Sequence, residues 1–140
     1  MDMNKRLEFA VKIAKEAGNF TLEYYDRPGL RVDRKGDGTP VTDADRGAEK
    51  LLRQRIAEAF PDDAILGEEF PCVPGTSGLR WILDPIDGTK SFIHGVPFYS
   101  TLIGVEKYDT ADPDNHKKSE MLAGVIWLPA LQRGVWAQKG

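Results

Sequence analysis

The first 60 residues carry their apolar side chains at helical spacing. In residues 5–25 they recur every three or four positions with charged residues between them, which predicts an amphipathic helix. A second stripe of the same period begins near Thr42, where Thr42 and Asp45 form the S/T-x-x-D/E pattern that starts helices, and Pro61 ends it. The intervening residues 31–40, RVDRKGDGTP, are rich in Gly, Asp and Lys and are expected to form an exposed loop. Two helices are therefore predicted in this part of the chain.

The pattern then changes to short apolar runs bounded by turn residues, which are typical of β-strands. These runs lie at residues 64–66, 81–83, 100–105, 121–128 and 134–137. A polar, proline-containing stretch at residues 108–120 predicts a long hairpin-type connection between two strands. Helices followed by a run of adjacent strands favour an α+β fold, in which the two helices pack on a mostly antiparallel sheet.

Composition narrows the class of protein. A chain of 140 residues, 41% of them apolar, has the size of one domain and is able to bury a core. The formal charge of −3 argues against a nucleic-acid partner. Charged residues interrupt the apolar positions of the amino terminus, which excludes a signal peptide, and no run approaches membrane-spanning length. The single cysteine, Cys72, permits no internal disulfide, so a cytoplasmic protein is expected.

The strongest chemical signal is the segment WILDPIDGT at residues 81–89. An apolar strand there delivers two carboxylates, Asp84 and Asp87, three positions apart into a turn that opens a new element. Pro85 fixes one backbone angle and lacks an N–H, so the carbonyl of Ile86 can be left pointing inward as an oxygen ligand. The alternative interpretation is an ordinary turn, because Asp-Pro and Asp-Gly are both common in loops for local reasons.

A second acidic position, Glu68, follows the preceding predicted strand directly after a glycine. If the two strands are neighbours, Glu68, Asp84 and Asp87 form a group of like charges that cations must neutralise. Oxygen ligands suit magnesium, whereas the chain has no His/Cys set that favours zinc. A calcium EF-hand loop is excluded, because Ile86 and Gly95 stand where that loop needs ligands. Taken alone, Glu68 would be interpreted as part of a solvated turn.

Three further residues surround this turn. Gly88 permits close backbone approach, and Thr89 brings a hydroxyl to the first turn of a helix expected at residues 90–94, whose free N–H groups would face a phosphate. Asp45 lies near the start of the second helix, where capping alone explains a carboxylate. It is equally placed to accept a proton from Thr89 and to orient that hydroxyl toward a water.

Several segments resemble the signature of the inositol monophosphatase superfamily, and together they extend over nearly the whole chain. The segments are residues 39–46 (TPVTDADR), 66–70 (LGEEF), 81–92 (WILDPIDGTKSF), 94–98 (HGVPF) and 129–133 (PALQR). Within the superfamily they are most similar to the histidinol-phosphate phosphatases. The sequence Asp-Gly-Thr-Lys also resembles the 3′(2′),5′-bisphosphate nucleotidases.

The resemblance implies a layered α/β sandwich and a set of Mg²⁺ ligands comprising Glu68, Asp84, the Ile86 carbonyl and Asp87. It also implies that Glu68, Thr89 and Asp45 activate and orient a water for in-line attack on phosphorus. Asp87, Gly88 and Thr89 would lie beside the substrate phosphate. Lys35 matches a loop that is expected to be mobile without metal and that helps to hold a more weakly bound ion.

Members of the superfamily carry a second half, whose Trp-Asp motif completes the second metal site. Residues 1–140 are therefore expected to be the amino-terminal metal-binding domain, without the carboxyl-terminal domain. The expected substrate is a small phosphorylated metabolite, with L-histidinol phosphate ahead of inositol monophosphate or a nucleotide 3′-phosphate. The alternative from another class is a non-catalytic domain that binds Mg²⁺ weakly, or a subunit with a partner, including a homo-oligomer.

Overall fold

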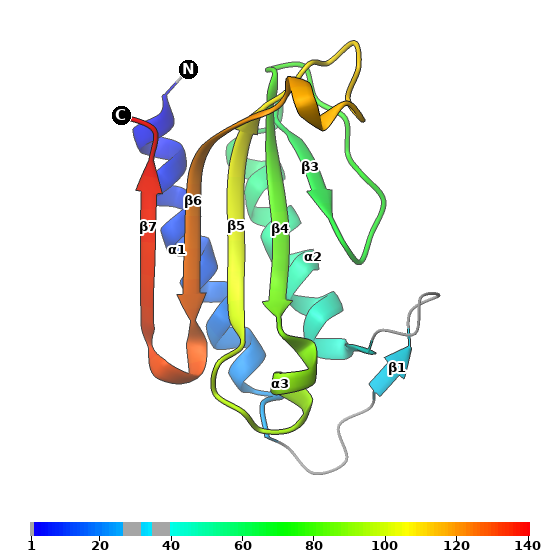
Figure 1. Cartoon of the computed structure of the whole chain (residues 1–140), viewed down its shortest axis with the longest axis vertical. Coiled ribbons are helices and arrows are strands. Elements are labelled where there is room, and N and C mark those ends of the chain that lie inside the picture. The colour runs from blue at the N-terminus through cyan, green and yellow to red at the C-terminus, as the bar shows by residue number, and fades with distance from the viewer. Residues whose placement is uncertain (1, 27–31, 35–39) are drawn as a thin grey trace.

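The computed structural model describes residues 2–26, 32–34 and 40–140, which form two layers (Figure 1). One layer is a five-stranded sheet of order β3-β4-β5-β6-β7, and the other holds the long helices α1 and α2. The helices are α1 (Met3–Leu22), α2 (Asp43–Ala59) and α3 (Thr89–Ile93), with the 3₁₀ turns η1 (His116–Lys118) and η2 (Pro129–Leu131). The strands of the sheet are β3 (Ala64–Gly67), β4 (Leu79–Asp87), β5 (Ser100–Lys107), β6 (Glu120–Leu128) and β7 (Arg133–Gln138).

The α+β fold predicted from the sequence is confirmed, with both long helices packed on a mostly antiparallel sheet. β3 and β4 run parallel, and every later neighbouring pair in the sheet is antiparallel. The parallel pair is possible because the chain crosses from the end of β3 back to the start of β4 through residues 68–78. As a result, the carboxyl ends of β3 and β4 lie at the same edge of the sheet.

The expectation of a loop at residues 31–40 is wrong in part. Two short strands, β1 (Val32–Arg34) and β2 (Pro40–Thr42), pair antiparallel there, with Val32 opposite Thr42. The glycines and charges between the strands dominate the sequence pattern and conceal this pairing, which consists of only three residues on each side. Lys35 lies outside the described residues.

The main core lies between the sheet and the two long helices. Alternate residues of β4 and β5, such as Trp81, Leu83 and Ile103, are buried on the face toward the helices. Small residues let α1 approach the sheet closely. A Cβ atom at Gly18 would lie 2.7 Å from the Trp127 ring, so the helix has no room for a side chain there. Close packing of this kind fixes the sheet against the helices.

The opposite face of the sheet is open. Within the described part of the chain, no helix covers this face over β5, β6 and β7 (Figure 1). Apolar side chains there line a hollow of about 510 Å³, and Asp84 also lines it, together with Ile82 and Leu102. None of the helices in the described residues is both long and apolar enough to cross a membrane.

Candidate active site at the ends of β3 and β4

The end of β4 is distorted where its two aspartates lie. Asp84 pairs with Leu102 of β5, but Asp87 pairs with Ser100, so β4 has one more residue than β5 over this stretch. Such a β-bulge bends a strand and redirects its side chains. The Pro85 carbonyl inside the bulge accepts a hydrogen bond of 2.8 Å from the buried hydroxyl of Thr101. The bulge is therefore held by a side chain of the neighbouring strand.

A short hydrogen-bond network follows the bulge. The Thr89 hydroxyl lies 3.2 Å from Asp45 Oδ1 and 3.3 Å from the Ile86 carbonyl oxygen, and its single proton is shared between these two acceptors. Gly88 precedes it with φ of 86°, in the left-handed region that a residue with a side chain rarely adopts. This turn brings Thr89 back toward the start of α2, where Asp45 lies.

Asp45 has two roles in the structure at once. Its Oδ2 accepts hydrogen bonds from the Thr42 backbone N–H at 2.9 Å and from the Thr42 hydroxyl at 2.8 Å, which completes a capping box at the start of α2. Its Oδ1 faces Thr89. The residue is 2% exposed, so the carboxylate is fixed in orientation and shielded from bulk water. Capping and contact with Thr89, which the sequence left as alternatives, therefore both occur.

Glu68 approaches the same edge of the sheet from β3. Gly67, the last residue of β3, is paired with Leu83, so Glu68 and Asp84 are the next residues on adjoining parallel strands. Glu68 and Asp87 are exposed, whereas Asp84 is half-buried. The backbone thus places three carboxylates at neighbouring strand ends. Among the described residues, however, no three His, Cys, Asp or Glu side chains are gathered into a group that could hold a metal ion.

An aromatic cluster packs against the turn that follows β4. The Ile86 side chain is 3% exposed and packs with Phe92 and Tyr99, whose rings meet edge to face at 4.9 Å between centroids. Burial raises the pKa of the Tyr99 hydroxyl, although a hydrogen bond to Thr21 partly opposes this effect. Because the Ile86 side chain is held in this cluster, its backbone carbonyl is held in place as well.

Sequence reasoning missed two groups that contact this site. One is Thr101, which looks like any residue of an alternating strand. The other is the pair Glu49 and Arg53 on α2, whose spacing of four residues is typical of an exposed helical ion pair. Glu49 is instead completely buried, and its Oε1 accepts a hydrogen bond of 3.0 Å from the backbone N–H of Glu69. The sequence signal that could have revealed this burial is that Glu49 falls on the same face of the predicted helix as its apolar residues.

Comparison with known proteins gives a consistent result. The model of the inositol monophosphatase family matches residues 2–140. The chain is 47% identical over 138 residues to a histidinol-phosphatase of Chlorobaculum parvum, covering 99% of this chain and 49% of the relative. It is 41% identical over 134 residues to a histidinol-phosphatase of Mycobacterium tuberculosis, covering 96% of this chain and 48% of the relative. The chain thus spans about half the length of the curated relatives that it matches.

The fold is similar to solved structures as well. The extragenic suppressor protein suhB of Bartonella henselae superposes with a TM-score of 0.85 at 32% identity, over 97% of this chain and 50% of that chain. The similarity therefore includes the two helices, the sheet and the turn after β4.

Proposed function

Because the chain belongs to the inositol monophosphatase family, we propose that it is the metal-binding half of a magnesium-dependent phosphomonoesterase. The observation that carries this proposal is the contact of the Thr89 hydroxyl with both Asp45 and the Ile86 carbonyl. It joins a fixed hydroxyl to the bulge that bears Asp84 and Asp87. Helix capping uses Oδ2 of Asp45 and does not account for the contact of its Oδ1 with Thr89.

The donors at these strand ends fit magnesium. Asp84, Asp87, Glu68 and the Ile86 carbonyl all present oxygen atoms, which Mg²⁺ prefers, and this edge offers neither His nor Cys among those positions. We propose these four as the ligands. Glu68 and Asp87 are exposed, so an ion at this edge of the sheet has access to both, whereas the bulge and the aromatic cluster hold the backbone carbonyl.

The residues of the chain then have distinct roles in hydrolysis. The Thr89 hydroxyl donates to Asp45, so its lone pairs are left to accept a hydrogen from water and to orient it, with Glu68, toward phosphorus. Asp87, Gly88 and Thr89 line the place of the phosphate. The water oxygen forms a bond to phosphorus as the ester P–O bond breaks, and the alcohol leaves with a proton. Bound magnesium supplies charge neutralisation and a more acidic water.

The substrate proposed is L-histidinol phosphate, which would be hydrolysed to L-histidinol in histidine biosynthesis. The basis is the name shared by the two similar relatives, together with the sequence motifs. Inositol monophosphate and a nucleotide 3′-phosphate are the runners-up within the same chemistry. The corresponding compartment is the cytoplasm, and the proposed partner is a small phosphorylated metabolite.

The test is magnesium-dependent release of phosphate by two proteins: this chain, and the same chain joined to the second half of the Chlorobaculum parvum relative. The second half is expected to supply the aspartate of the Trp-Asp motif, which completes the second metal site. We expect the longer protein to be faster by at least about 100-fold, because loss of one such electrostatic stabiliser costs about 100- to 1,000-fold in rate. Loss of substrate-positioning groups adds to that deficit. The Asp87→Asn variant of each protein, which lacks one proposed metal ligand, gives the background rate of phosphate release.

Each outcome decides a different part of the proposal. If the short chain alone turns over histidinol phosphate at an ordinary rate that Asp87→Asn abolishes, then its site is complete within these residues or across an oligomer interface. If only inositol monophosphate or a nucleotide releases phosphate, the chemistry stands and the substrate is wrong. If neither protein releases phosphate from any of the three, the non-catalytic alternative replaces the enzyme.

A further inference from the structure

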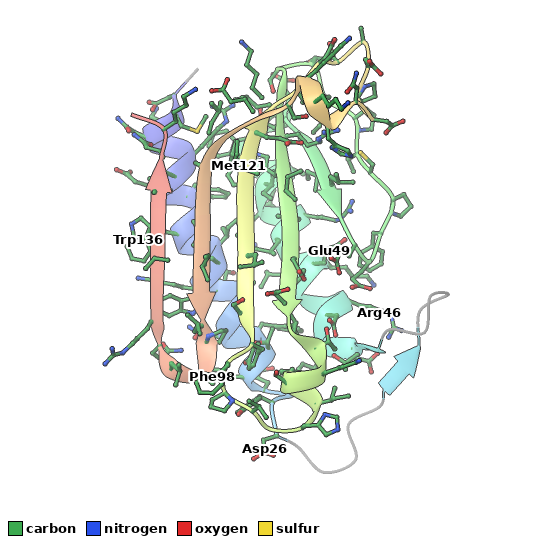
Figure 2. All side chains as sticks on the ribbon, in the orientation of Figure 1. Asp26, Arg46, Glu49, Phe98, Met121 and Trp136 are labelled. Carbon is green, nitrogen blue, oxygen red and sulfur yellow. The ribbon has the colours of Figure 1, made fainter. Side chains whose placement is uncertain are left out.

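We propose that Glu49 and Arg53 of α2 are positioning residues, which hold the end of β3 so that Glu68 faces the metal site. The inference rests on the proposed function, in which Glu68 is a metal ligand. Glu49 projects from α2 toward the segment that follows β3 (Figure 2). Glu49 is fully buried, so ions from solvent do not reach its carboxylate and it is not proposed as a metal ligand.

The contacts of Glu49 lie on both sides of Glu68 along the chain. Before it, a Cβ atom at Gly67 would lie 2.5 Å from the Glu49 carboxylate, so the backbone of Gly67 rests directly against that group. After it, the backbone N–H of Glu69 donates a hydrogen bond of 3.0 Å to Glu49 Oε1. The residue before Glu68 and the peptide unit after it thus both lie against one buried carboxylate.

Arg53 completes the arrangement. Its Nε donates to Glu49 Oε2 at 2.9 Å, and its two terminal nitrogens donate to the backbone carbonyls of Phe70 at 2.8 Å and Pro71 at 2.7 Å. The guanidinium therefore neutralises the buried carboxylate and holds the next two residues of the same segment. A planar fork with five donors is able to make all these bonds at once, which a lysine cannot do.

A structural role alone would not require this placement. An ion pair that only stabilised α2 would need no contact with the backbone on both sides of a proposed ligand. Removing groups that orient metal ligands typically weakens metal binding about 10- to 100-fold. The inference therefore predicts a loss of metal affinity that is separate from any loss of stability.

The experiment measures Mg²⁺ affinity by calorimetry and the unfolding temperature on the same samples. Glu49→Ala removes the carboxylate, while Gly67→Ala keeps both charges and pushes the end of β3 away from it. Both should bind Mg²⁺ at least about tenfold more weakly than the unmodified chain. Glu49→Gln, which keeps an oxygen for the Glu69 N–H, should lose less affinity than Glu49→Ala.

The matched control is Asp63→Asn. It also disrupts an ion pair of a buried carboxylate, that of Asp63 with Arg6, but at the opposite end of β3. This control should lower the unfolding temperature and leave Mg²⁺ affinity unchanged. If Glu49→Ala does not fold, Gly67→Ala and Glu49→Gln decide the question by the same measurement.

The possible results separate the two proposals. If the unmodified chain binds Mg²⁺ and the folded variants at positions 49 and 67 bind it equally well, the positioning role is wrong and the proposed function is untouched. If the unmodified chain does not bind Mg²⁺ at all, the proposed metal site is wrong and this inference is wrong with it. Equal loss of affinity in Asp63→Asn would also overturn the inference, because the effect would then follow stability.

Discussion

A few buried polar contacts determine how the residues of the site are presented. The bulge in β4 takes the Pro85 carbonyl out of the regular ladder, and the Thr101 hydroxyl supplies its hydrogen bond at 2.8 Å. The next carbonyl, that of Ile86, is contacted by the Thr89 hydroxyl. Two successive carbonyls thus have side-chain donors from different elements, which orients the Pro85–Ile86 and Ile86–Asp87 peptide units. The sequence singled out Thr89, because it follows the Asp-Gly turn, but it did not point to Thr101, because a Thr in a strand has no distinctive pattern.

Thr101→Val should destabilise the chain by about 1–3 kcal/mol, because it leaves the buried Pro85 carbonyl without its donor while conserving side-chain volume. Urea unfolding followed by circular dichroism measures the change. Thr101→Ser retains the hydroxyl and should recover part of the loss. Equal stability of the valine variant and the unmodified chain would mean that water replaces the hydroxyl.

Asp63 should make stability depend on pH in the acid range. Burial disfavours its ionised form, but hydrogen bonds from Arg6, Ser77 and Trp81 outweigh burial and lower the pKa of the Asp63 carboxyl. A lowered folded-state pKa means that this stabilisation is complete above the unfolded-state pKa of about 4 and is lost as the pH falls through the folded-state value.

The measurement is the unfolding temperature of the unmodified chain and of Asp63→Asn between neutral and acidic pH. At neutral pH the variant should be less stable by about 1.5–3 kcal/mol, as expected for hydrogen bonds to a charged group. The difference should shrink below about pH 4, where the carboxylate becomes protonated. A difference that stays constant throughout the acid range would show that Asp63 does not titrate with unfolding.

At the scale of elements, helical periodicity was enough to predict the two long helices, and short apolar runs between turn residues were enough to predict the strands of the sheet. The start of α2 was also predictable, because Thr42 and Asp45 are local in sequence and form the expected capping box. The short pair β1 and β2 was not, since three residues on each side give no period to detect. The burial of Glu49 was missed for a different reason. Helical spacing to Arg53 indicates an ion pair but does not say whether a loop covers it.

The capping box of α2 links the stability of that helix to the orientation of Asp45. Thr42→Ala should reduce the free energy of unfolding by about 1 kcal/mol, as is typical when a helix loses its cap. Thermal unfolding followed at the helical circular-dichroism band gives the value. Thr42→Ser keeps the hydroxyl that bonds to Asp45 and serves as the matched control. A serine variant as unstable as the alanine variant would show that the threonine methyl group, and not the cap, provides the stability.

At the scale of the whole molecule, the sheet has one covered and one open face. The open face is apolar where β6 and β7 adjoin: Ile126 and Val135 are register partners, and they are 44% and 65% exposed. Met121 on β6 (Figure 2) is also exposed. Contiguous apolar surface of this kind usually marks a contact with other protein. The sequence does not predict the open face. Apolar residues on both faces of a strand do not reveal whether another part of the structure covers the second face.

We therefore predict that the isolated chain associates with itself through this face. Ile126→Lys combined with Val135→Glu would place opposite charges on neighbouring strands, which is compatible with the sheet and disfavours apolar contact between molecules. Sedimentation velocity over a dilution series should show the unmodified chain shifting to larger species as concentration rises, while the double variant stays monomeric. Lys12→Glu, on the exposed side of α1, changes charge without touching this face and should behave like the unmodified chain. If the unmodified chain is monomeric at every concentration, the open face does not drive association. If Lys12→Glu also prevents association, contacts of α1 are involved and the apolar face alone does not account for it.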